Sequence, residues 1–111
     1  MDTQQLSTEA VAQGIANGQF TASEVLVAYM QRIETTDAKV NAFTTPCFER
    51  AVQEAKAIDQ RRTRGDTLPP LAGVPYAVKN LYDIQGTVTL AGSTVNQTNP
   101  PAQADAFLVQ Q

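Results

Sequence analysis

The sequence predicts an α/β protein whose helices come first and whose sheet is incomplete. Helix-start signals, each followed by apolar residues at helical spacing, recur over residues 1–70. The composition changes at "GDTLPP", residues 65–70, where two prolines break any helix. A short continuous apolar run follows over residues 71–79, which is typical of a buried strand. We therefore expect an N-terminal helical region, residues 1–70, and the truncated start of a sheet-containing core, residues 71–111.

The first two helices are predicted from their end signals. Ser7 can accept a hydrogen bond at the start of a helix over residues 8–17, and Gly18 can end that helix. Thr21 and Glu24 have the S/T-x-x-E spacing of a capping box, which opens a second helix. The buried face of this second helix is expected to contain Leu26, Tyr29, Met30 and Ile33.

A third helix is expected to begin at Thr45-Pro46, because proline in the first helical position loses no hydrogen bond. The arginines at 61–64 suit the negative end of this helix dipole, and Gly65 follows. Its apolar stripe is expected to contain Phe48, Ala51, Ala55 and Ile58. All three helices have the ordinary amphipathic pattern of a scaffold.

The remainder predicts strands and one short helix. Residues 71–79 form a candidate strand buried on both faces, and residues 87–91 a second, weaker one. Asp105 is expected to cap a helix in "ADAFLVQQ", which reaches little more than one turn. A buried strand needs partners on both edges and cover on both faces. We therefore expect the chain to be an N-terminal piece of a longer α/β protein.

Composition excludes several classes of function. The 111 residues carry a net charge of −3, and the longest basic cluster is at 61–64, so a nucleic-acid surface is not expected. No apolar run approaches the roughly 20 residues that span a bilayer, and the polar start "MDTQQLSTEA" lacks a secretory signal. A chain with one cysteine and no histidine predicts no metal site and no cofactor. The single cysteine also fits a reducing, cytoplasmic compartment.

Lys79 is the candidate catalytic residue. It ends the most hydrophobic segment of the chain, and in open α/β sheets ligands gather at the carboxyl ends of strands. An amine held among apolar neighbours loses solvation, which favours its neutral form, and a neutral amine can act as a general base. The alternative is a lysine at a strand end that extends to water. From the residues alone, this structural alternative is favoured.

The neighbours of Lys79 allow two interpretations each. Asn80 could orient a substrate carbonyl or cap a loop, and Asp83 could neutralise Lys79 or begin a turn, which the nearby Gly86 favours. Ser93 has no histidine to activate it, so a Ser-His-Asp triad is excluded within these residues. Cys47 is expected inside the third helix, in a packing or surface role.

A resemblance adds to these observations. Residues 71–93, "LAGVPYAVKNLYDIQGTVTLAGS", closely resemble the first motif of the amidase signature family, G-[VI]-P-x-x-[VI]-K-[DN] followed by a glycine and T-x-x-G-S. Residues 40–73, "VNAFTTPCFERAVQEAKAIDQRRTRGDTLPPLAG", are similar to the N-terminal helices of the same family. Within the family, Asn80, "LYDI" and "LAGS" look most like the 1-carboxybiuret hydrolases.

The resemblance implies the mixed-sheet amidase signature fold and a Ser–cis-Ser–Lys triad in which Lys79 is the lysine. Its neutral amine would take a proton through the bridging serine and so activate the nucleophilic serine. Both serines belong to a glycine-serine-rich motif that is absent from these 111 residues, and Ser93 is not that nucleophile. We therefore expect the chain alone to be inactive.

Three functions remain open at this stage. The first is an amidase that hydrolyses a small amide or a biuret-type substrate such as 1-carboxybiuret. The second is the amidase-like component of a tRNA-dependent amidotransferase, which shares the motif. The third is a non-catalytic helical module that binds a partner chain. Enzymes of the amidase signature family commonly form dimers and some carry a small accessory subunit. The expected protein partners are therefore a second copy, in a homodimer, and such an accessory subunit. Neither nucleic acid nor membrane is expected as a partner.

Overall fold

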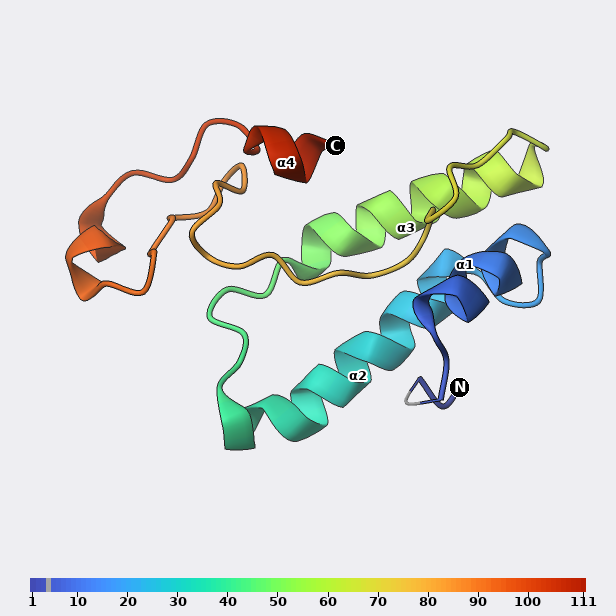
Figure 1. The fold of residues 1–111 in the computed structure, drawn as a ribbon, viewed down its shortest axis with the longest axis horizontal. Coiled ribbons are helices and arrows are strands. Elements are labelled where there is room, and N and C mark those ends of the chain that lie inside the picture. Colours follow the sequence, from blue (N-terminus) through green and yellow to red (C-terminus); the bar gives the residue numbers. More distant parts are fainter. Residues whose placement is uncertain (4) are drawn as a thin grey trace. The chain divides into compact units, whose positions relative to one another are not determined.

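The computed structural model describes residues 1–3 and 5–111. Within these residues the elements are α1 (Thr8–Ala16), α2 (Ala22–Val40), α3 (Phe48–Thr63), the 3-10 helix η1 (Thr94–Thr98) and α4 (Phe107–Gln110). They belong to two compact units, Met1–Pro75 and Tyr76–Gln111. Figure 1 shows the order of the elements along the chain, with α2 and α3 of the first unit running antiparallel.

The starts of α1 and α2 follow the capping chemistry that the sequence predicts. The Ser7 side chain accepts a hydrogen bond from the Ala10 N–H at 3.1 Å, and Gly18 follows α1 with φ +73. At α2, the Glu24 N–H donates to Thr21 Oγ1 at 3.0 Å, while the Thr21 N–H donates to the Glu24 carboxylate at 2.8 Å. Both halves of the capping box are therefore present, and these two predictions are confirmed.

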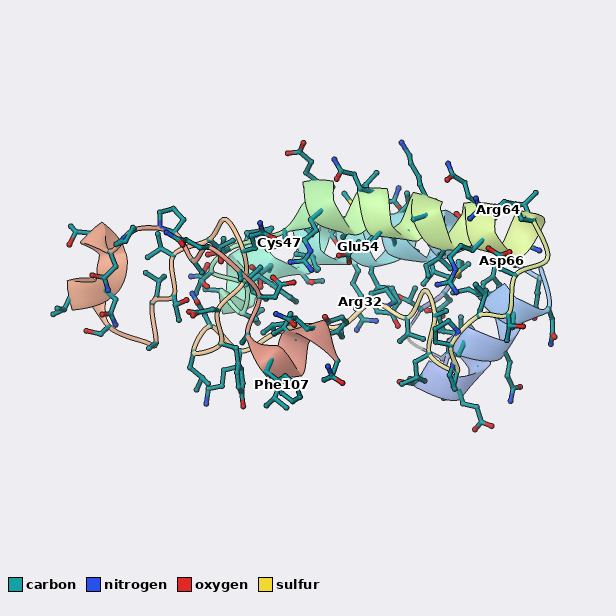
Figure 2. All side chains as sticks on the ribbon, turned by 90° about the horizontal axis from the view of Figure 1, so that it is seen from above. Arg32, Cys47, Glu54, Arg64, Asp66 and Phe107 are labelled. Carbon is teal, nitrogen blue, oxygen red and sulfur yellow. The ribbon has the colours of Figure 1, made fainter. Side chains whose placement is uncertain are left out.

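The predicted start of α3 is wrong by two residues. The helix begins at Phe48, with Cys47 rather than Thr45 at the N-cap and no side-chain cap. Its first turn closes through the hydrogen bond from the Ala51 N–H to the Cys47 carbonyl oxygen at 3.0 Å, so Pro46 lies outside the helix. Cys47 is therefore an exposed residue at the helix start, not an interior one (Figure 2).

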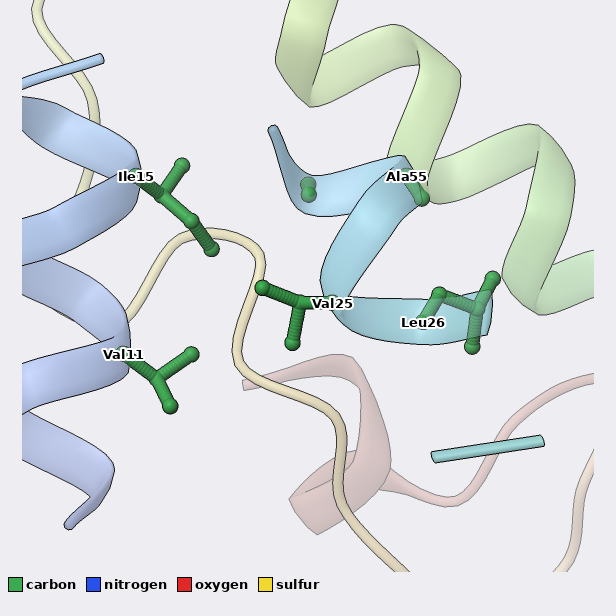
Figure 3. Packing of buried hydrophobic residues seen from close by; sticks show 6 residues of the cluster. Val11, Ile15, Val25, Leu26 and Ala55 are labelled. Carbon is green, nitrogen blue, oxygen red and sulfur yellow. The ribbon is translucent and has the colours of Figure 1, made fainter. Parts of the chain in front are cut away.

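The core of the first unit joins three helices. Val11 and Ile15 of α1 face Val25 and Leu26 of α2, and Ala55 of α3 completes the cluster (Figure 3). The side chains packed around this cluster include most of the two predicted apolar faces: Tyr29, Met30, Ala51 and Ile58. Ile15 and Val25 are fully buried. Burying such a side chain stabilises the fold by about 1.5–3 kcal/mol, so this small cluster is what holds the helices together.

The second unit is built from turns. No strand occurs in residues 1–3 and 5–111, so the strands expected over 71–79 and 87–91 are absent there. Their backbone amides bond locally instead: the N–H groups of Val74, Tyr82, Thr87 and Ser93 each donate to the carbonyl three residues earlier. A strand forms only when another strand pairs with its edge, and the described residues provide no such partner. The helices are confirmed, whereas the sheet stays a prediction.

The last predicted helix is confirmed, but its cap is not. α4 is four residues long and has Ala106 at its N-cap, with no side-chain cap. The Asp105 carboxylate accepts from the Gln85 N–H at 2.9 Å, and its carbonyl oxygen accepts from the Gln110 side chain at 2.8 Å. Asp105 therefore connects two loops of the second unit rather than opening the helix.

Candidate functional site

The motif at residues 71–93 is divided between the two units. Gly73, Val74 and Pro75 end the first unit, whereas Lys79 and everything after it belong to the second. Val74 is partly buried against the helical core. The first half of the motif is therefore a packing element of the helical unit, and the second half carries the candidate catalytic residue.

Gly73 lies so close to the core that no side chain fits there. A Cβ atom at this position would lie 2.7 Å from Ile15 Cδ1 and 2.9 Å from Ala22 Cβ, well inside van der Waals contact. The residue also has φ +82, a backbone conformation that favours glycine. The glycine of the G-V-P sequence is thus required twice, by its backbone angle and by its contact with Ile15 and Ala22.

Lys79 is exposed, and this corrects the expectation of a buried amine. Its carbonyl oxygen accepts hydrogen bonds from the N–H groups of Leu81 at 2.8 Å and Tyr82 at 3.1 Å, so a tight turn begins at this residue. The preceding Val78 is half-buried and Tyr76 is 69% exposed. Burial of the amine would require a packed strand over 74–79, and in these residues that segment is not a strand. The geometry neither adds to nor removes the catalytic assignment of Lys79.

Asn80 and Asp83 hold loops together, as the structural interpretations predict. Asn80 Oδ1 accepts from the Leu90 N–H at 3.2 Å, and the Asn80 carbonyl oxygen accepts from the Ala91 N–H at 2.8 Å. The Asp83 carboxylate accepts from the Thr89 hydroxyl. The Asp83 carbonyl oxygen accepts from the Ala106 N–H at 2.9 Å. Asp83 therefore joins a turn to two later segments.

Ser93 also has a local role here. It lies at the N-cap of η1, where its hydroxyl oxygen accepts from the Val95 N–H at 3.3 Å. An asparagine that the sequence analysis did not single out, Asn96, donates from Nδ2 to the Leu90 carbonyl oxygen at 2.8 Å. Its spacing of six residues from Leu90 gave no helix or strand signal, which is why the contact could not be predicted.

The arginines after α3 have structural contacts. Figure 2 shows Arg64 and Asp66 just beyond the helix, where they form an ion pair at 3.4 Å. Arg61 Nη2 donates to the Thr67 carbonyl oxygen at 3.2 Å. Arg62 lies against Gly18, where a Cβ atom would be 2.7 Å from Nη1. These contacts connect the end of α3 to the loops around it.

Neither a membrane span nor a metal-binding cluster accompanies these residues. No helix in residues 1–3 and 5–111 is long and apolar enough to cross a membrane. In the same part of the chain, no three side chains from histidine, cysteine, aspartate and glutamate lie together as metal ligands would.

Comparison with known proteins identifies the family. The family model described as Amidase matches residues 24–111, which include α3, nearly all of α2 and the whole motif around Lys79. The chain belongs to the amidase family. The match of the motif at residues 71–93 to this family is therefore confirmed.

Two amidase-family relatives show how far the similarity extends. The chain is 55% identical over 105 residues to AtzE of Pseudomonas sp. strain ADP, which is part of a 1-carboxybiuret hydrolase, and the match covers 95% of this chain and 23% of AtzE. It is 42% identical over 94 residues to the GatA-type component of the glutamyl-tRNA(Gln) amidotransferase of Streptomyces coelicolor. That second match covers 85% of this chain and 19% of the relative. The chain thus spans about a quarter or less of these amidases.

A solved structure agrees with the sequence comparison. It has a TM-score of 0.93 and 55% sequence identity to this chain, of which it covers 95%, while the chain covers 23% of it. That structure is described as a vestigial protein complex that reveals the evolutionary origins of an s-triazine catabolic enzyme. The path of these residues is therefore the path of the corresponding quarter of that amidase.

Proposed function

We propose that this chain forms part of an amidase that hydrolyses the C–N bond of a small amide, with 1-carboxybiuret as the favoured substrate. The observation that carries the proposal is the 55% identity over 105 residues to AtzE, part of a 1-carboxybiuret hydrolase. The family match includes the segment that leads to Lys79 and the loop after it. Within this proposal, residues 71–111 open the catalytic core.

Lys79 is proposed as the lysine of a Ser–cis-Ser–Lys triad. Its neutral amine accepts a proton from the bridging serine, which accepts one from the nucleophilic serine. The serine oxygen then bonds to the amide carbon, the C–N bond breaks, and the protonated amine leaves. Water attacks the acyl-enzyme and returns the proton to the amine of Lys79. Both serines are supplied by residues outside this chain. The exposure of Lys79 described above is consistent with a side chain whose partners come from elsewhere.

The experiment is a chimeric enzyme in which this chain replaces the 105-residue stretch that it matches in AtzE. We expect the chimera to hydrolyse 1-carboxybiuret, and Lys79→Ala to lower kcat by about 10³-fold or more, as loss of a triad member does. Lys56→Ala, an exposed lysine of α3, is the matched control and should leave kcat unchanged. Full activity of the Lys79→Ala chimera would refute the assignment.

The chain of 111 residues by itself should release no ammonia from 1-carboxybiuret, because the nucleophile is missing. The parent chimera, assayed at the same concentration, provides the positive control. Hydrolysis by the isolated chain that depends on Lys79 would contradict the proposed triad.

A second candidate is a component of a tRNA-dependent amidotransferase, favoured by the 42% identity to the Streptomyces coelicolor protein. Such an enzyme would release ammonia from glutamine and pass it to a second site. Assaying the chimera with glutamine as well as 1-carboxybiuret separates the two candidates. Release of ammonia from glutamine alone would favour the amidotransferase.

The proposed protein partners are a second copy and a small accessory subunit. Two descriptions support this proposal, since AtzE is named as a subunit of its enzyme and the solved structure is described as a protein complex. The proposed compartment is the cytoplasm, which fits the free, exposed thiol of Cys47. Sedimentation of the chimera with and without the accessory chain would measure its assembly.

A further inference from the structure

The turn that carries Lys79 is fixed at both of its ends. The Lys79 carbonyl oxygen accepts from the N–H groups of Leu81 and Tyr82, so this residue begins the turn. Asn80, the next residue, is bonded to the segment around Leu90, and Asp83 at the far end is bonded to Thr89. The backbone of residues 79–83 is thereby joined twice to residues 89–91.

The partner of Asn80 is itself a strained turn. The Ser93 N–H donates to the Leu90 carbonyl oxygen at 2.9 Å. Both central residues have positive φ, +48 at Ala91 and +73 at Gly92, which is the pattern of a type I′ turn. The left-handed conformation costs a residue with a Cβ roughly 1–2 kcal/mol. Ala91 therefore keeps this conformation because other contacts hold it there.

Asn80 supplies the contacts that hold Ala91. Its side-chain Oδ1 accepts from the Leu90 N–H at 3.2 Å and its carbonyl oxygen from the Ala91 N–H at 2.8 Å, so two consecutive amides of the strained turn bond to one residue. Asn96 binds the opposite side of the turn, with 2.8 Å between Nδ2 and the Leu90 carbonyl oxygen. We call this set of four residues, Asn80, Leu90, Ala91 and Asn96, the Asn80 clasp.

We propose that Asn80 is a positioning residue for Lys79, acting through the Asn80 clasp. The inference rests on the proposed function, because it concerns the placement of the catalytic amine. Lys79 and Asn80 share a peptide bond, so the clasp and the turn at Lys79 together fix the Cα from which the lysine side chain extends. A displacement of about 1 Å at a reacting group costs on the order of 10²-fold in rate. Loosening the clasp should therefore affect the chemical step rather than substrate binding.

The test uses the chimeric enzyme and separates kcat from KM. Asn80→Ala removes the Oδ1 acceptor, and we expect kcat to fall about 10–100-fold while KM changes less than about threefold. Asn80→Asp keeps an acceptor oxygen for the Leu90 N–H and should return kcat to within about threefold of the parent. Gln97→Ala, an exposed residue of η1 in the same unit, is the control and should match the parent in both constants.

A double variant tests the route through the turn. Glycine adopts positive φ without the cost that alanine bears, so Ala91→Gly should stabilise the turn when Asn80 no longer holds it. We expect the Asn80→Ala/Ala91→Gly chimera to recover a large part of the lost kcat. A lesion that acted only on general stability would also lower the thermal midpoint in proportion, and recovery would follow that midpoint instead of kcat.

Asn96→Ala gives an independent measurement should Asn80→Ala fail to fold. It loosens the Leu90 turn from the other side, 17 positions from Lys79, and should lower kcat at constant KM. Parent kcat in both Asn80→Ala and Asn96→Ala would overturn the inference, and so would a rise in KM at unchanged kcat. If Lys79→Ala is inactive in the same assay, only the positioning role fails. If Lys79→Ala is active, the proposed function fails.

Discussion

The carboxylate of Asp59 accepts two hydrogen bonds from Ser23, at 3.1 Å from the backbone N–H and 2.6 Å from the hydroxyl. Its other oxygen accepts from the Ala22 N–H at 2.7 Å. A residue near the end of α3 therefore satisfies the free amides in the first turn of α2, which a helix cannot bond internally. The negative charge also suits the positive end of the α2 dipole. Asp59 thus connects two helices whose hydrophobic contact is small.

Asp59→Ala should destabilise the packing of α2 on α3 by about 1–3 kcal/mol, because the half-buried amides of Ala22 and Ser23 would lose their acceptor. Native-state hydrogen exchange should then show α2 amides exchanging about 10–100-fold faster. Glu54→Ala is the control: its ion pair with Arg50 is exposed, and its loss should cost less than about 0.5 kcal/mol. Equal effects of the two changes would contradict the role given to Asp59.

Gly73→Ala should destabilise the helical unit by about 2–4 kcal/mol, since the new methyl group meets Ile15 and Ala22 and the positive φ is strained. Gly65 is the matched control, because it has nearly the same φ, +81, in the same unit, with open space around the Cβ position. Gly65→Ala should therefore cost only the backbone term, about 1–2 kcal/mol. Chemical denaturation of the chimera, followed by exchange at α1 and α2, measures both changes, and identical losses would exclude a packing role for Gly73.

Thr21→Val should cost about 1 kcal/mol, because it removes the hydroxyl that accepts from the Glu24 N–H while keeping the shape of the side chain. Thr36→Val removes a hydroxyl that only donates to a carbonyl oxygen within α2, and should change stability by less than about 0.5 kcal/mol. Exchange rates of the first-turn amides of α2 distinguish the two. Unaltered protection at Glu24 in the Thr21 variant would disprove the cap.

Amides of residues 76–111 should exchange faster than those of α1, α2 and α3 in the isolated chain. The second unit has only a four-residue α-helix and a 3-10 helix, and several of its large apolar side chains are exposed, Tyr76 at 69% and Phe107 at 71%. Such exposure also favours self-association of the isolated chain. Exchange followed by mass spectrometry at low and high concentration checks both points. A single cooperative unfolding transition covering the two units would contradict them.

The parts of the fold that could be predicted from sequence are those decided by neighbouring residues. The caps at Ser7 and Thr21 depend on atoms within three residues, so short motifs were sufficient. The start of α3 was missed because Thr45-Pro46 has a capping signal but no hydrogen-bonded turn. The residue before proline is disfavoured in helical conformation, and the helix begins only at Phe48.

What could not be predicted depends on contacts between distant residues. The Asp59–Ser23 bonds join positions 36 residues apart, and nothing in either segment announces the partner. The two strands were predicted from apolar runs, but a run becomes a strand only if another strand pairs with it, and the described residues form turns there. Lys79 was found by its motif, whereas its burial was inferred from the unformed strand and was wrong for these residues.

The seating of Gly73 against Ile15 and Ala22 has a geometric consequence for catalysis. Six residues of backbone connect Gly73 to Lys79, and a fully extended chain covers at most about 3.6 Å per residue. The helical unit therefore acts as a mooring that confines the lysine Cα to a sphere of roughly 20 Å radius around the anchored glycine. Any hydroxyl that works with this amine has to be delivered inside that sphere, or within one lysine side-chain length of it.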